Sequence, residues 1–137
     1  MIPNVAPIFR QYISDTVGVS VFSLKPGTRP PKCVVMQLIP AGAHITGGVS
    51  GEKSREFGWR RFLIHCWDSS DNTGRDGDAA IDLAEQVRQA MVNSIMAGFG
   101  VHKVRIPGEP GQYYDPNEAS PRVQLMVDVL MKNVVRQ

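Results

Sequence analysis

Apolar and polar positions follow a helical period most clearly between residues 76 and 97. Polar side chains take one side of this segment, and the apolar stripe on the other side consists of Ala80, Leu83, Ala84, Val87, Ala90, Met91 and Ile95. Asp76 or Asp78 stands where a carboxylate can cap the first turn, and Gly98 follows the last turn. The pattern predicts an amphipathic helix whose small alanines let its backbone lie close to a β-sheet.

Other segments have the character of β-strands, namely residues 19–24, 33–39, 60–68, 101–106 and 122–135. Most of them mix apolar and polar positions, which is typical of a strand with one buried face. The segment 33–39 is apolar at almost every position, so we expect it to lie centrally in the sheet and to be covered on both faces. Two of the strands, 60–68 and 101–106, flank the long helix.

Residues 4–17 predict a first helix. Asn4 can cap it, Pro7 falls in its first turn, where a missing N–H costs little, and Gly18 follows its end. The order of elements predicts an α+β fold, with a single mixed β-sheet of about four to five strands and two helices packed on one face. We expect one domain that spans residues 1–137.

A glycine-rich segment without a sustained period separates two of the predicted strands. We expect it to form a flexible arm at about residues 41–58. One interpretation is a mobile surface excursion. The other is an arm that becomes ordered on contact with a partner and places Lys53, Arg55 and Glu56 in an interface.

Composition and charge narrow the class of protein. The formal net charge of +2 is too small to predict tight binding to duplex nucleic acid. Cys33 and Cys66 each lie within an apolar strand, where a free thiol behaves as a small hydrophobe, and we expect both to be reduced. The chain has no leader pattern and no apolar run of about 20 residues, so we expect a soluble protein that is made in the cytoplasm.

The sequence contains no specific catalytic or metal-binding pattern. His44, His65 and His102 are far apart and lack the spacing of a metal motif. His65 and Cys66 are adjacent, but neighbouring residues on a strand point to opposite faces, so they cannot share a proton. The glycines at 47–51 lack the lysine and the following helix of a phosphate-binding loop. We therefore predict no catalytic, cofactor-binding or metal-ligating residue.

The last predicted loop, residues 107–121, contains residue types that favour protein interfaces. Tyr113, Tyr114 and Asp115 stand together in this loop, and Arg122 opens the strand that follows. In one interpretation these four residues belong to an interface. In the other, one tyrosine packs beneath the loop and the other is simply exposed.

The order of the segments along nearly the whole chain carries a family resemblance. After the first helix come RPPKCVVMQLI, the glycine-rich arm, FLIHCWD, AIDLAEQVRQAM and DPNEASPRVQLMVDVLM. The most telling positions are Ala80, Leu83, Ala84 and Val87 in the helix, and Asp115-Pro116 followed by Pro121-Arg122 before the final strand. In this order and spacing the chain resembles the tail terminator proteins of long-tailed bacteriophages, which are also called tail completion proteins.

This resemblance implies a structural virion protein with no enzymatic activity and no cofactor. Such a subunit forms a hexameric ring on the head-proximal end of the tail tube, stops tube polymerisation and joins the tail to the head. The implied partners are further copies of the chain, the tail tube protein and the head–tail connector protein. Genome DNA passes through the ring without specific binding, and no membrane is involved. The implied location is the virion, after assembly in the host cytoplasm.

Head-to-tail contacts between the subunits of such a ring are expected to bury the arm or the loop from Tyr113 to Arg122. Two alternatives stay open. The first is a head-closure or connector protein of the phage neck. The second is a small ligand-binding or enzymatic α+β domain that uses His65 and Trp67 in a pocket between sheet and helix.

Overall fold

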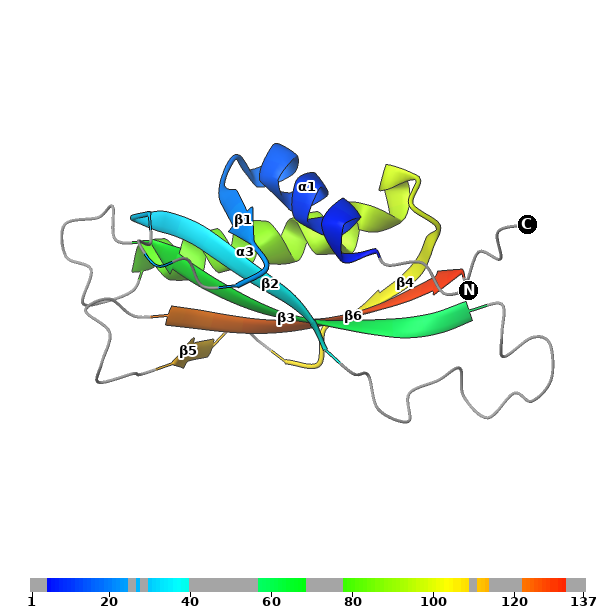
Figure 1. Ribbon diagram of the computed structural model, residues 1–137. Helices are drawn as coiled ribbons and strands as arrows, with labels where there is room; N and C mark the ends of the chain where they lie inside the picture. Colours follow the sequence, from blue (N-terminus) through cyan, green and yellow to red (C-terminus); the bar gives the residue numbers. More distant parts are fainter. Residues whose placement is uncertain are drawn as a thin grey trace.

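The computed structural model describes residues 5–24, 27, 30–39, 57–68, 78–108, 111–113 and 122–132. They form two α-helices, one short 3-10 helix and six strands (Figure 1). In chain order these are α1 (Ala6–Val17), β1 (Ser20–Phe22), β2 (Lys32–Ile39), β3 (Phe57–Asp68), α3 (Asp78–Asn93), η2 (Ser94–Ala97), β4 (Val101–Arg105), β5 (Gly111–Tyr113) and β6 (Arg122–Lys132).

The strands form one mixed sheet in the order β1-β2-β3-β6-β4, and β5 also pairs with β6. Only β1 and β2 are parallel, and the other pairs are antiparallel. The long β3–β6 pair, which runs from Phe57 opposite Lys132 to Cys66 opposite Val123, is the middle of the sheet. Because β3 and β4 both run antiparallel to β6, they point the same way, with β6 between them and α3 connecting them.

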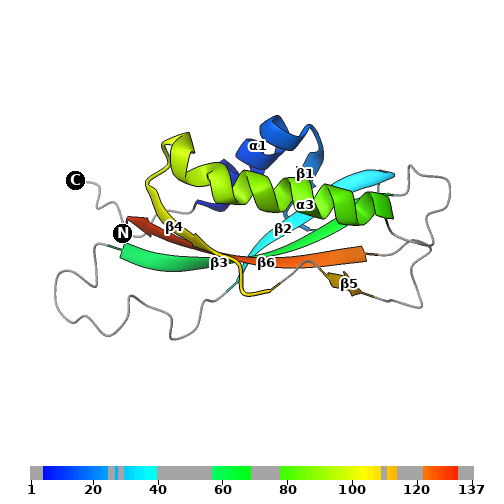
Figure 2. The same ribbon diagram turned by 180° about the vertical axis from the view of Figure 1, so that it is seen from behind.

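Both helices lie on the same side of this sheet, as the two views in Figures 1 and 2 show. The buried residues of α3 are Ala80, Leu83, Ala84, Val87, Ala90 and Met91, as the predicted stripe requires. Ile95 was wrongly included in that stripe, since it lies in η2, where the helical period changes, and its side chain is exposed. Phe9 of α1 packs against Phe62 of β3, with 5.0 Å between the ring centroids. The α+β prediction, with one mixed sheet and two helices on one face, is confirmed.

Left-handed glycines end both helical segments. Gly18 has φ of 76° and donates its backbone N–H to the Ser14 carbonyl over 3.0 Å, and Gly98 has φ of 83°. Within the helix predicted for residues 76–97, the structure has α-helix over Asp78–Asn93 and 3-10 helix over Ser94–Ala97. The N-cap of α1 is Val5, which has no capping side chain, and Asn4 lies outside the described residues.

The central strand β2 is buried on both faces, as predicted. Val34 and Met36 belong to the main core beneath the helices, whereas Cys33 and Val35 pack with Trp67 on the other face. The two cysteines are free and lie on opposite faces, since Cys66 is opposite Val34 in the β2–β3 register. Burial, followed by the proximity of Cys33, raises the pKa of the Cys66 thiol to about 12, which makes this thiol unreactive at neutral pH.

Two predicted boundaries were wrong. The arm was expected to reach residue 58, but Phe57 and Gly58 already belong to β3, where they pair with Lys132 and Met131. The loop over 107–121 contains β5, which pairs with the start of β6. In both places the backbone partner comes from a distant strand, which local sequence does not reveal. No helix within the described ranges has the length and apolar character that a membrane span requires.

Candidate functional site

The face of the sheet opposite α1 and α3 is called the open face here, because no helix of the described residues lies on it (Figures 1 and 2). Strand register brings three side chains of this face into one row, with Asp128 of β6 between Arg61 of β3 and Arg105 of β4. The next row along the strands places Leu130 between Trp59 and Lys103.

Asp128 is fully buried and accepts hydrogen bonds from both arginines. Arg61 donates Nε to Oδ1 over 2.7 Å and Nη2 to Oδ2 over 2.9 Å. Arg105 donates Nη2 and Nε to Oδ2, over 2.9 Å and 3.3 Å. The carboxylate therefore joins three adjacent strands across the open face and fixes the direction of two guanidinium groups.

Burial alone would raise the pKa of the Asp128 carboxyl. The hydrogen bonds and positive charges of Arg61 and Arg105 outweigh that effect, and the pKa lies below its ordinary value. The hydrogen bond to Asp128 in turn raises the pKa of Arg61. One carboxylate therefore stands between two guanidinium groups.

The Trp59 ring and two lysines lie beside the row of Arg61, Asp128 and Arg105. The guanidinium of Arg105 lies 4.4 Å from the centroid of the Trp59 ring, a cation–π arrangement. Lys103 and Lys132 are exposed, and the β4 and β6 registers place them on the open face. The term cationic patch is used below for the four cations around Trp59, which are Arg61, Lys103, Arg105 and Lys132.

Arg122, a predicted interface residue, lies at the other end of the open face. It is half-buried, and its guanidinium lies 5.8 Å from the centroid of the Trp67 ring. The ring of His65 is 6.0 Å from the same indole. Cys66 points instead into the core beneath the helices, so it and His65 lie on opposite faces of the sheet.

Most of the other predicted interface residues lie outside the part of the chain that the structure describes. Lys53, Arg55, Glu56, Tyr114 and Asp115 lie outside the described residues. Tyr113 is described only by its backbone, which ends β5 opposite Arg122. Of the predicted set, the structure therefore brings together Tyr113 and Arg122.

The alternative with a pocket between sheet and helix does not match the position of its residues. Trp67 packs with Cys33 and Val35 on the open face, and His65 lies beside it, so neither side chain lies between the sheet and α1 or α3. In the described ranges no group of three His, Cys, Asp or Glu residues could hold a metal ion.

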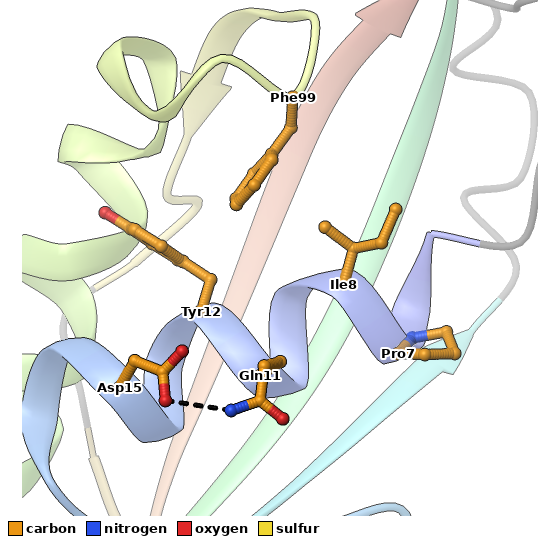
Figure 3. A pocket seen from close by; sticks show the side chains of 6 residues that line it. All are labelled: Pro7, Ile8, Gln11, Tyr12, Asp15 and Phe99. Carbon is orange, nitrogen blue, oxygen red and sulfur yellow. Dashed lines mark hydrogen bonds between the residues drawn. The ribbon is translucent and has the colours of Figure 1, made fainter.

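A shallow apolar groove of about 480 Å³ lies instead on the outside of the helix layer (Figure 3). Its lining residues are Pro7, Ile8, Gln11, Tyr12, Asp15 and Phe99. Tyr12 and Phe99 meet edge to face at 5.3 Å, and Gln11 Nε2 donates to Asp15 Oδ1 over 2.8 Å. The groove holds one carboxylate and no cation, so it differs in charge from the open face.

Sequence reasoning missed the Arg61–Asp128–Arg105 row and Trp59. Alternation along β3 and β6 does place Arg61 and Asp128 on the polar side of their strands. Their pairing depends on the strand order and register, which the sequence does not show.

The chain presents two chemically distinct sides: an open sheet face with fixed arginines and a helix layer with an apolar groove. No protein-family model matches this sequence, and no curated protein matches it either.

Proposed function

We propose that the chain is a structural subunit of a phage tail. In this role it forms a six-membered ring on the head-proximal end of the tail tube, ends tube polymerisation and connects the tail to the head. The order of the sequence segments described above is the reason for choosing this class. The proposal concerns assembly, so it needs surfaces for partners and no catalytic group.

The observation that supports the proposal is that the two faces of the sheet differ. Both α1 and α3 cover one face of the sheet, and no helix of the described residues lies on the other face (Figure 2). A subunit of a ring around a channel needs one side toward the channel and a different side toward the outside. We assign the open face to the channel and the helix layer to the outer surface.

Contacts between neighbouring subunits then belong to the ends and edges of the sheet. A closed ring is built from heterologous contacts, in which two different surfaces of the subunit meet. We assign one of these surfaces to the end of the sheet where Arg122 lies over Trp67 and Tyr113 is opposite Arg122. Arginine and tyrosine are enriched in protein interfaces because they combine a large contact area with polar tips.

The experiment that tests the function uses the whole chain and purified tail tubes. Native mass spectrometry over a concentration series, with negative-stain images of each species, should give six-membered rings with an open centre, or a monomer that forms rings on tube ends. Tubes polymerised with the chain should be capped and shorter. A monomer that leaves tube length unchanged would contradict the proposal, and binding to a portal instead of a tube would favour a head-closure protein.

A further inference from the structure

The two sides of the molecule differ strongly in charge. Among the described residues, the open face carries five cationic side chains and only one carboxylate, a net charge of +4; they are Arg61, Lys103, Arg105, Arg122, Lys132 and Asp128. The two α-helices carry Arg10 and Arg88 against four carboxylates, a net charge of −2; the acids are Asp15, Asp78, Asp82 and Glu85. The small net charge of the chain is therefore a sum over two unlike surfaces.

The cationic patch has the size of a short stretch of phosphate backbone. It crosses the three adjacent strands β3, β6 and β4, a width of about 10 Å at the usual strand spacing. From the row of Asp128 to Lys132 it extends for about 13 Å along β6, at the usual rise per residue in a strand. That length equals the rise of roughly four nucleotides along one strand of a duplex.

The two arginines of the cationic patch are fixed before any ligand arrives. Asp128 holds both guanidinium groups, and Trp59 supports the face of Arg105. The side chain of Arg105 is nevertheless 42% exposed, so it can also contact a ligand. Fixing a cation in advance lowers the entropy lost on binding.

The composition of the patch favours nucleic acid over an acidic protein segment. A sheet face with an aromatic ring and an arginine on it, and with lysines around them, matches surfaces that track a sugar–phosphate backbone. Apart from buried Asp128, no acidic side chain of the described strands lies on this face, so none of them repels phosphates. We propose that the cationic patch binds the phosphate backbone of nucleic acid without reading its sequence.

This binding does not depend on ring formation, so it is tested on the chain in solution. The probes are a fluorescent 20-nucleotide single strand and the matching duplex, with anisotropy measured between 20 and 200 mM salt. Three to four cations that neutralise phosphates predict a slope of log K against log salt of about −2 to −3.5. A larger affinity for one probe shows whether a single strand or a duplex is the better ligand.

Lys103→Gln and Lys132→Gln are the variants, since both side chains are exposed. Each should weaken binding on the order of tenfold at 20 mM salt and make the slope shallower by about 1. The matched controls are Arg10→Gln and Arg88→Gln on the helix layer, which remove the same charge and should change affinity by less than twofold.

Three outcomes would overturn the inference: no binding at 20 mM salt, equal losses in patch and control variants, or equally tight binding of polyglutamate. The third would mean an acidic protein partner. The lysine variants should still cap tail tubes, because they leave the Arg122 end unchanged. A failure of nucleic-acid binding is therefore separable from a failure of the proposed ring.

Discussion

At the scale of single residues, Asp128 has the largest expected effect on stability. Asp128→Asn keeps the shape of the side chain but removes the charge that faces Arg61 and Arg105. Removing one charge of a buried ion pair leaves the charges of its partners uncompensated. We therefore expect a loss of about 3 kcal/mol in the free energy of unfolding. Urea denaturation measures this loss. The control Asp82→Asn, at an exposed helix position, should change the same quantity by less than about 0.5 kcal/mol, and equal losses in both variants would contradict the role of Asp128.

The lowered pKa of Asp128 also predicts how stability depends on pH. The unfolded carboxyl titrates near its ordinary pKa of about 3.9, and the folded one titrates lower, so the unfolded chain binds the extra proton first. The stabilisation is thus complete above the unfolded pKa and is lost as the pH falls through the folded pKa.

We therefore expect the difference in unfolding free energy between the wild type and Asp128→Asn to be constant from pH 7 to pH 5 and to shrink below about pH 4. Using the difference cancels the titration of the other carboxylates. Urea denaturation at each pH measures it, and a difference that stays unchanged down to pH 2.5 would argue against a lowered pKa.

At the scale of elements, the end of the long helical segment depends on backbone conformation. A methyl group at Gly98 would meet no atom within 4 Å, so only the positive φ of 83° opposes a side chain there. Gly98→Ala should cost about 1 to 2 kcal/mol in the free energy of unfolding, because L-residues disfavour this region. Gly108→Ala, which also has open space but no positive φ, should be neutral or slightly stabilising. Thermal unfolding of the two variants compares them, and equal shifts would mean that the conformation at Gly98 is unimportant.

The same elements show which part of the fold the sequence can predict. The alanine-rich stripe of α3 and the apolar run of β2 reflect burial directly, so both elements and their buried faces were predictable. Strand β5 was not, because a three-residue strand in a loop rich in glycine and proline is stabilised by its pairing with β6. Phe57 and Gly58 were assigned to the arm for the same reason, since their strand conformation depends on the far end of β6.

At the scale of the whole molecule, the candidate site was less predictable than the fold. Arg61, Arg105 and Asp128 are separated along the chain and meet only because β6 lies between β3 and β4. The net charge of +2 likewise conceals a cationic open face, because the carboxylates of the helices compensate it in the sum. The row of three side chains and the positive charge of the open face both depend on strand order, which determines which residues lie side by side on one face.

Assembly of the whole subunit depends on its Arg122 end if that end joins neighbouring copies. Arg122→Glu removes the cation next to Trp67 and should cost only about 1 kcal/mol in folding stability, the range of a partly exposed cation–π contact. If this end joins neighbouring subunits, the same change places a negative charge in the contact and should abolish rings and tube capping while the monomer stays folded.

The matched control for that experiment is Arg10→Glu, which makes the same change of charge on the outer helix layer. It should leave ring formation and tube length as in the wild type. Arg122→Lys should restore capping in part, because it keeps the charge but loses the planar group that stacks on the indole. Tube lengths from negative-stain images measure all three variants. Normal capping by Arg122→Glu would exclude this end of the sheet as the subunit contact and would shift the search to the outer edges β1 and β4.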